Sequence, residues 1–237
     1  MIVMTGFLVA CADRWRICRG VAAVRLSTVM GMEFTDVIKR RRMVRAFTAQ
    51  PLPEGITDRL LRAAERAPSA GFSQGYSFLV LSGRDDTAPL WQIFYDLADS
   101  PGSPADEAAQ IDALAPVPLV IVPLACKDIY LSRYAEPDKG WTDQDEARWP
   151  VPYWYIDTGF TALLMMLAAV DAGLGHVFFG IPPAHMDAFC AAYGVPAKWT
   201  PIGALAVGYP DPPADPVRPA HPSERKPLAS LVHHGRW

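Results

Sequence analysis

One segment of this 237-residue chain constrains its fold more than any other. From Tyr155 to Ala172 the residues follow a helical pattern that is apolar on nearly every side, and Gly173 and Gly175 end it. A helix that is apolar all round must be buried in the middle of a larger body. The stretch is shorter than the roughly 20 apolar residues that a membrane-spanning helix needs. We therefore expect a central core helix and no membrane partner.

Shorter patterns place further elements on both sides of this helix. Helices are predicted at 33–42, 53–67, 89–97, 104–114 and 182–193, and strands at 76–81, 117–122, 177–179 and 202–207. The second strand is apolar on both faces, as in a sheet that is covered on both sides. Residues 128–150 mix charges with aromatic rings and predict a long loop with helical turns, of the kind that often forms a binding lid. Neither a Rossmann fingerprint nor a Walker loop is present.

The two ends of the chain differ from the middle. Residues 1–31 lack a helical or strand period, although Leu8–Cys11 resembles a lipoprotein cleavage site. No positively charged region precedes that site, which favours a poorly ordered extension instead. Residues 210–222 are rich in proline and predict an extended segment. The last ten residues are apolar enough to dock on another surface, so we expect one domain over residues 32–237.

Charge and cysteine content argue against several classes of function. The net charge of −3 provides no basic excess for binding nucleic acid. The four cysteines form no C-x-x-C pair and the histidines show no zinc-ligand spacing, so no metal site is predicted. Such thiols are typical of a reducing compartment, and we place the protein in the cytoplasm. No serine–histidine–aspartate arrangement can be inferred, and we assign no catalytic acid or base.

The strongest local concentration of charge is the segment Lys39–Arg45, which holds five cations in seven residues. Such charges repel one another unless an anion lies between them, and arginine binds phosphate oxygens in pairs. If the segment is helical, Arg41 and Arg45 lie one turn apart and converge on one group. The alternative is a basic helix end that faces water and complements the helix dipole.

Three further features are compatible with a flat, charged ligand. Small residues fill the connection from Ala67 to Gly75, where the backbone can approach a ring closely, although a plain helix-to-strand connection is the alternative. Within it, Gln74 offers an amide that both donates and accepts hydrogen bonds. Near the C terminus, Arg225 and Lys226 form a cation pair that by itself indicates only solvated surface. The aromatic residues of 130–155 fit either a substrate pocket or packing within a lid.

In this order and at these separations, the segments resemble the nitroreductase family. The residues that carry the resemblance are Arg41–Phe47, Ala67–Tyr76, the long helix from Asp157 to Gly175, and the ending Arg225–Trp237. The resemblance spans Glu33 to Trp237. It implies an α+β fold in which helices wrap a central, mostly antiparallel sheet. It also implies a homodimer in which the C-terminal tail embraces the partner and the flavin site lies at the interface.

The resemblance implies a function and a set of site residues as well. FMN would be held non-covalently and would pass a hydride from NAD(P)H to a nitroaromatic, a quinone or a similar small acceptor. The alternatives are another flavin or deazaflavin redox enzyme on the same scaffold (a dehydrogenase or dehalogenase) and a flavin-binding protein without turnover. The residues expected to bind the cofactor are Arg41, Arg42, Met43, Arg45, Pro68, Ser69, Ala70, Gln74, Phe179, Gly180, Arg225 and Lys226.

The chain also departs from the family pattern at three places. Met43 stands where serine is common, Phe72 where asparagine is usual, and Gly75–Tyr76 where the family has proline and tryptophan. The first two changes remove polar contacts with the flavin or the substrate. They leave the expected phosphate ligands in place, with Arg45 towards N1 and O2 of the ring and Arg225 at the phosphate.

Overall fold

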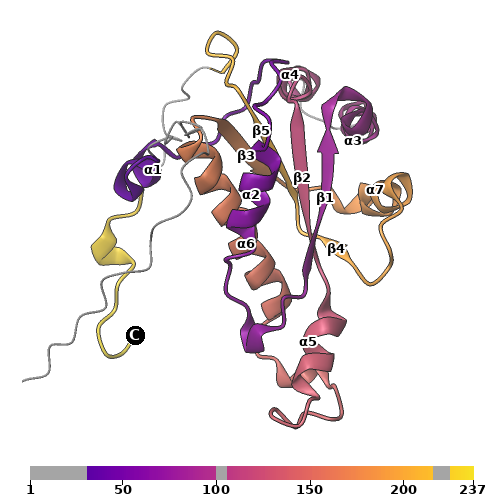
Figure 1. Ribbon diagram of the computed structural model, residues 1–237, viewed down its shortest axis with the longest axis vertical. Coiled ribbons are helices and arrows are strands. Elements are labelled where there is room, and N and C mark those ends of the chain that lie inside the picture. Colours follow the sequence, from indigo (N-terminus) through magenta and orange to yellow (C-terminus); the bar gives the residue numbers. More distant parts are fainter. Residues whose placement is uncertain (1–30, 100–105, 216–224) are drawn as a thin grey trace, which may run out of the picture. The chain divides into compact units, whose positions relative to one another are not determined.

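The computed structural model describes residues 31–99, 106–215 and 225–237. In this part of the chain a five-stranded sheet carries helices on both faces (Figure 1). The strands are β1 (Tyr76–Ser82), β2 (Leu119–Ala125), β3 (Gly175–Phe179), β4 (Thr200–Pro201) and β5 (Ala204–Gly208). The α-helices are α1 (Phe34–Arg40), α2 (Ile56–Ala64), α3 (Gly83–Ala98), α4 (Glu107–Leu114), α5 (Lys127–Tyr134), α6 (Tyr153–Asp171) and α7 (Met186–Tyr193).

The sheet has the strand order β1-β2-β5-β3, with β4 paired to β2, and every strand pair is antiparallel. The segment after α1 extends the sheet beside β3, because Met43 forms a parallel bridge with His176 of that strand. Phe47 forms an antiparallel bridge with Pro210. The expected α+β fold with a central, mostly antiparallel sheet is therefore confirmed.

The core consists of one hydrophobic cluster on each face of the sheet. In β2, Leu119 and Ile121 pack with α2 and α6, whereas Val120 and Val122 pack with α3, α4 and α7. Successive side chains of a strand point to opposite faces, so a strand that is covered on both sides must be apolar at every position. This explains why all of β2 is buried, as its continuous apolar pattern predicted.

The central helix is present and begins at Tyr153, two residues before the predicted start. Met165 and Ala169 lie inside the core, and α6 packs against α2 and against four strands of the sheet. At 19 residues it is long and apolar enough to cross a membrane, contrary to the expectation that no stretch reaches that length. This is weak evidence for a membrane span, because the core helix of a protein can have the same length and composition, and 44% of an 18-residue apolar stretch of α6 is buried.

The basic segment differs from the expected conformation. Helix α1 ends at Arg40, and residues 41–47 are extended rather than helical. The backbone N–H of Val44 donates to the carbonyl oxygen of His176 at 2.8 Å, so pairing with β3 replaces the next helical turn. Residues four apart in extended chain are separated by about 13 Å. The predicted convergence of Arg41 and Arg45 across one helical turn is therefore wrong.

Residues 128–150 were predicted as a long loop with helical turns, and the structure shows a regular eight-residue helix at their start. Helix α5 covers their first part, and a 3₁₀ turn follows at Glu146–Arg148. In α5 the one buried side chain is Tyr130. A helix that buries a single residue leaves too little apolar periodicity to be detected in the sequence.

Both chain ends remain largely untested. The expected extension of residues 1–31 lies outside the described residues apart from Gly31, and so do residues 216–222 of the proline-rich stretch. The described part of that stretch is not extended throughout, because the backbone N–H groups of Ala214 and Asp215 donate to the carbonyl oxygen of Asp211 in a turn. Residues 225–237 are exposed and contain one 3₁₀ turn, Leu228–Ser230. Docking of this tail on a partner therefore stays a prediction.

Candidate functional site

The connection between α2 and β1 forms a tight loop. Its 3₁₀ turn, Ala70–Phe72, contains one residue with unusual backbone angles and stands just before another, since φ is +56° at Phe72 and +51° at Gln74. For residues other than glycine, this left-handed conformation costs about 1–3 kcal/mol and persists only where the surroundings enforce it. The surroundings here are aromatic. A Cβ added to Gly71 would lie 2.7 Å from the ring of Tyr134, and one added to Gly75 would lie 2.4 Å from Tyr130.

A buried carboxylate holds one side of this loop. Asp157, on the first turns of α6, is 3% exposed. Its Oδ2 accepts a hydrogen bond from the backbone N–H of Ala70 at 2.8 Å and another from the hydroxyl of Tyr130 at 2.8 Å. Burial, followed by the hydrogen bond to Asp157, raises the pKa of Tyr130. The hydroxyl therefore stays protonated and serves as a donor.

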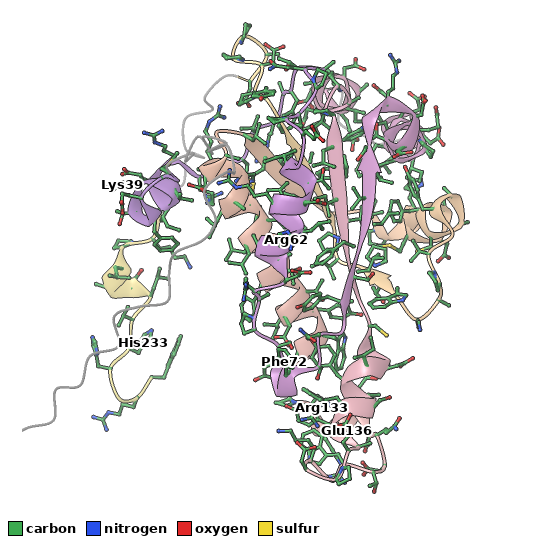
Figure 2. All side chains as sticks on the ribbon, viewed as in Figure 1. Lys39, Arg62, Phe72, Arg133, Glu136 and His233 are labelled. Atoms are coloured by element: carbon green, nitrogen blue, oxygen red, sulfur yellow. The ribbon has the colours of Figure 1, made fainter. Side chains whose placement is uncertain are left out.

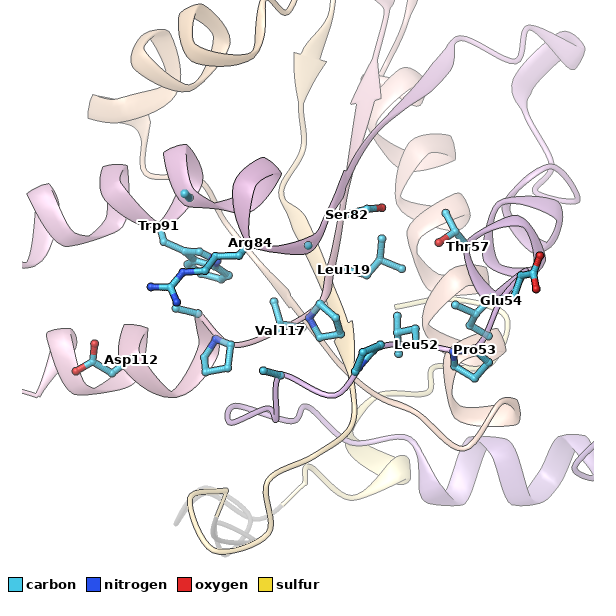
Figure 3. A pocket seen from close by; sticks show the side chains of 18 of the residues that line it. Leu52, Pro53, Glu54, Thr57, Ser82, Arg84, Trp91, Asp112, Val117 and Leu119 are labelled. Carbon is cyan, nitrogen blue, oxygen red and sulfur yellow. The ribbon is translucent and has the colours of Figure 1, made fainter.

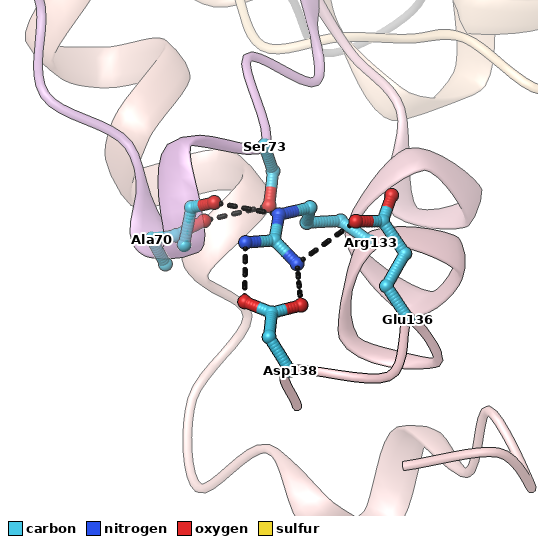
Figure 4. Close-up of polar contacts among 6 residues, drawn as sticks. Ala70, Ser73, Arg133, Glu136 and Asp138 are labelled. Atoms are coloured by element: carbon cyan, nitrogen blue, oxygen red, sulfur yellow. Dashed lines mark hydrogen bonds and ion pairs between the residues drawn. The ribbon is translucent and has the colours of Figure 1, made fainter. Parts of the chain in front are cut away.

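Helix α5 holds the other side of the loop through Arg133 (Figure 4). Its Nε donates to the carbonyl oxygen of Gly71 at 2.9 Å, and its two terminal nitrogens bind Asp138 at 2.7 and 2.8 Å. The hydrogen bonds from Arg133 lower the pKa of Asp138. Within the loop, the Ser73 hydroxyl donates to the carbonyl oxygen of Ala70 at 2.6 Å. The backbone is thus held from two helices.

The outer surface of the loop is open. Pro68, Phe72 and Gln74 are exposed, and the Phe72 side chain is 75% exposed (Figure 2). Ser69 is turned inward, and its Oγ accepts a hydrogen bond from the backbone N–H of Gln74 at 3.0 Å. A rigid small-residue backbone beside one exposed aromatic ring can accept a flat molecule.

The aromatic residues of α5 and of the segment after it pack mostly on one another. Ring centroids lie 4.5 Å apart for Tyr134 and Trp149, 5.0 Å for Tyr134 and Trp141, and 6.0 Å for Tyr130 and Trp149. The indole N–H of Trp149 is buried without a partner among the described residues. Of the two interpretations that the sequence left open, packing accounts for most of these rings.

The basic segment carries four arginines, and the three that were expected to bind the cofactor differ in their contacts. Arg42 forms an ion pair with Asp215, which is buried and also accepts the backbone N–H of Arg45 at 3.0 Å. The guanidinium groups of Arg41 and Arg45 have no ion-pair partner in the part of the chain that the structure describes. Met43 contributes its backbone to the bridge with β3 and is half-buried. Arg41 and Arg45 are therefore available to an anion.

Beside these arginines lies a histidine that the sequence did not single out as functional. His176 is fully buried, and neither ring nitrogen has a hydrogen-bond partner among the described residues. Burial, and then the nearby charge of Arg41, lowers its pKa to about 4. Together with Arg40 and Arg42 it lines a cavity of about 200 Å³. His176 is therefore neutral near pH 7. The sequence could not identify it as a cavity-lining residue, because a single histidine in a strand forms no motif.

The remaining predicted residues lie in different settings. The ring of Phe179 packs in the core against Trp91 and Phe94, with centroids 5.9 and 5.5 Å apart, so only its backbone is free for a ligand. Gly180 is exposed, and nothing lies within 4 Å of a Cβ built on it. Arg225 and Lys226 are exposed and stand after the gap at 216–224.

The loop and the basic segment are not brought together within one chain. The loop contacts α6 at Asp157, near its start, whereas Arg40 and Arg42 share a cavity with Val170, near its end. Thirteen residues of helix separate these two contacts, or about 20 Å at 1.5 Å per residue. One chain therefore presents two half-sites at opposite ends of α6.

A further cavity lies away from both half-sites. It has a volume of about 940 Å³ and is lined by Ala49, residues 51–57, residues of α3 up to Tyr95, Asp112 of α4 and residues 115–119 (Figure 3). Arg84, Trp91 and Asp112 are among its lining residues. None of the residues expected to bind the cofactor lines it.

Comparisons with known proteins agree with this architecture. An NADH dehydrogenase of Thermus thermophilus is 28% identical over 208 residues, which cover 81% of this chain and 91% of that protein. The nitroreductase CinD of Lactococcus lactis, solved with chloramphenicol, superimposes with a TM-score of 0.66 at 20% identity, covering 85% of this chain and 98% of its own. A structure from Exiguobacterium sibiricum, solved in complex with FMN, has a TM-score of 0.61 at 19% identity, covering 85% and 97%. The model of the nitroreductase family matches residues 38–209, and the chain belongs to that family.

Proposed function

We propose that the protein is an FMN-dependent oxidoreductase that transfers hydride from NAD(P)H to a nitroaromatic, a quinone or a similar small acceptor. Family membership supports the class of enzyme, and one structural relative was solved with FMN. The observation that carries the proposal is the loop at 67–75. Its backbone is held rigidly by Asp157 and Arg133, and its outer surface is open to a flat ring.

The two half-sites support a homodimer. The side chains of Phe160 and Leu163 on α6 are 41% and 42% exposed, and that of Phe34 on α1 is 69% exposed. Large apolar side chains gathered on the outside of a chain are typical of a surface that a second copy covers. In such a dimer, the loop of one subunit and the basic segment of the other can contribute to the same cofactor site.

The residues of the chain fit FMN. When bound, FMN supplies the hydride chemistry, while the protein provides position and electrostatics. Arg45 would place positive charge beside the ring, and Arg41 with Arg225 would bind the phosphate. Pro68, Ser69 and Ala70 would lie against the ring, and Gly180 would leave room beside it. Because the nucleotide and the acceptor need the same face in turn, ping-pong kinetics are expected.

A cytoplasmic location is part of the proposal. Two of the four cysteines lie in the described residues, Cys126 and Cys190, and both are free thiols. Free thiols are typical of a reducing compartment.

A spectroscopic experiment tests the proposed function. The purified protein is reconstituted with FMN, freed of excess flavin, and titrated anaerobically with NADH and with NADPH. Bleaching of the yellow colour, followed by its return when a nitroaromatic or quinone is added, supports the enzyme. A yellow protein that is inert to both nucleotides would instead support a flavin-binding protein without turnover. A protein that retains no FMN would contradict both.

A further inference from the structure

The carboxylate of Asp157 joins three elements at the flavin half-site. It lies on α6, accepts the hydroxyl of Tyr130 from α5, and accepts the backbone N–H of Ala70 from the loop. It is 3% exposed and has no cationic partner in the described residues. Its two donors are neutral and both bind Oδ2.

A carboxylate in this setting is costly for stability. Burying an ionised group without a counter-charge is unfavourable, and an apolar replacement of similar size is often neutral or stabilising. Two hydrogen bonds from neutral donors offset only part of that cost. Stability alone therefore does not account for an aspartate at this position.

What the carboxylate does control is the loop backbone. The Ala70 N–H that it accepts opens the 3₁₀ turn, and the left-handed residues Phe72 and Gln74 follow directly. Residues in that conformation relax when the structure around them loosens. The anchor at Ala70 thus sets the direction in which Ser69 and Ala70 present their backbone.

We propose that Asp157 is a positioning residue for the isoalloxazine ring, acting through the backbone N–H of Ala70. The proposal rests on the proposed function, since the loop is the part of the site that would meet the ring. Asp157 is assigned to the ring and not to the phosphate, because its two hydrogen bonds go to the loop and to α5. The Tyr130 hydroxyl holds the carboxylate in place.

Binding of two flavins tests this assignment. Asp157→Ala should weaken FMN and riboflavin by the same factor, about tenfold or more, as expected when a charge-assisted hydrogen bond is lost. Asp157→Asn keeps an oxygen that can accept the Ala70 N–H and should recover most of the affinity. The matched control is Asp171→Asn on the same helix, whose carboxylate pairs with Arg59 near the other end. It should leave both affinities within about twofold.

A second measurement needs no flavin. Phe72 is 75% exposed, so chymotrypsin can cleave after it when the loop loosens. Cleavage at this peptide bond, identified by fragment mass, should be at least about tenfold faster in apo Asp157→Ala than in the wild type. Asp157→Asn should restore the slow rate, and Asp171→Asn should not increase it.

The outcomes separate the inference from the proposed function. If the wild type binds no flavin, the proposed function fails, and the cleavage rates alone decide whether Asp157 holds the loop. If flavin binds but Asp157→Ala changes neither affinity nor cleavage, the positioning role is wrong. A loss of FMN affinity with unchanged riboflavin affinity would also overturn it, because the effect would then lie at the phosphate.

Discussion

Arg42 and Asp215 form an ion pair that ties the basic segment to the turn at Asp211–Asp215 after β5. The same carboxylate accepts the backbone N–H of Arg45 at 3.0 Å. One of the three arginines of this segment that were expected to bind FMN is thus engaged with the protein. Asp215 instead orients the segment on which Arg41 and Arg45 stand, and these two remain available for the phosphate and the ring.

The phosphate ligands can be tested by comparing two flavins. Arg41→Ala or Arg225→Ala should weaken FMN binding by about 1.5–3 kcal/mol, because a charge-assisted contact is lost. Riboflavin, which lacks the phosphate, should bind almost as before. Both affinities can be measured by quenching of flavin fluorescence, with Arg62→Ala on the exposed side of α2 as the control. Equal weakening of both flavins would indicate that these arginines support the fold instead.

Phe72 should determine which acceptors react well. An exposed ring beside the cofactor can stack on a flat apolar acceptor and contribute about 0.5–1.5 kcal/mol beyond its buried area. Phe72→Asn should therefore lower kcat/KM for apolar quinones and nitroaromatics by roughly tenfold. The variant should fold, because asparagine tolerates the φ of +56° found here better than phenylalanine does.

Stopped-flow measurements of the two half-reactions check this prediction. Reduction of the flavin by NAD(P)H should change by only a few-fold in Phe72→Asn, whereas reoxidation by the acceptor should slow. The reverse pattern would place Phe72 on the nicotinamide side of the site and contradict the proposed role.

The buried His176 should make the folded protein sensitive to acid. Its pKa is lowered from 6.5 to about 4, so the unfolded chain binds a proton more readily than the folded one between these values. The free energy of unfolding is therefore highest above about pH 6.5. It falls by roughly 3 kcal/mol in total as the pH falls towards 4. Denaturant titrations across this range should show a flatter pH dependence for His176→Leu than for the wild type. An unchanged slope would mean that other groups cause the acid sensitivity.

The dimer can be tested on the exposed side of α6. Phe160→Glu or Leu163→Glu places a charge on the surface that a second copy would cover, and isologous contact would bring like charges together. Sedimentation velocity should show a shift from dimer to monomer, accompanied by loss of bound FMN. Ala188→Glu, at an exposed position of α7 on the other face of the sheet, should remain dimeric. Monomeric wild type with full flavin binding would exclude the two-subunit site.

The N-terminal extension is expected to be dispensable. A chain that starts at Met32 should fold and bind flavin normally, because residues 1–31 lack periodicity and precede the first family-like helix. The new terminal amine would lie beside Asp171, which already accepts the Met32 N–H. Circular dichroism and flavin titration can compare this chain with the full-length protein. Loss of flavin or of the dimer would show that the extension is structural.

Features that depend on local pattern could be predicted from the sequence. The all-round apolar stretch that became α6 and the double-sided strand β2 were both identified, because each is apolar on nearly every side over its whole length and this pattern is visible without knowledge of its neighbours. The order of the basic segment, the small-residue loop, the long helix and the C-terminal ending was enough to indicate the family, because these segments resemble the family's motifs.

Tertiary structure decided what depends on contacts between distant residues. Residues 41–47 became extended because β3, more than 130 residues later, offered backbone partners that a further helical turn could not match. Phe179 turned into the core because Trp91 and Phe94 lay behind its strand. The hydrogen bond from the Ala70 N–H to Asp157, 87 residues away, could not be predicted from the residues around Ala70 or from those around Asp157. Hydrogen bonds and packing across such separations depend on the whole fold. The periodic spacing of apolar residues that indicates a helix or a strand is contained within a short stretch of sequence.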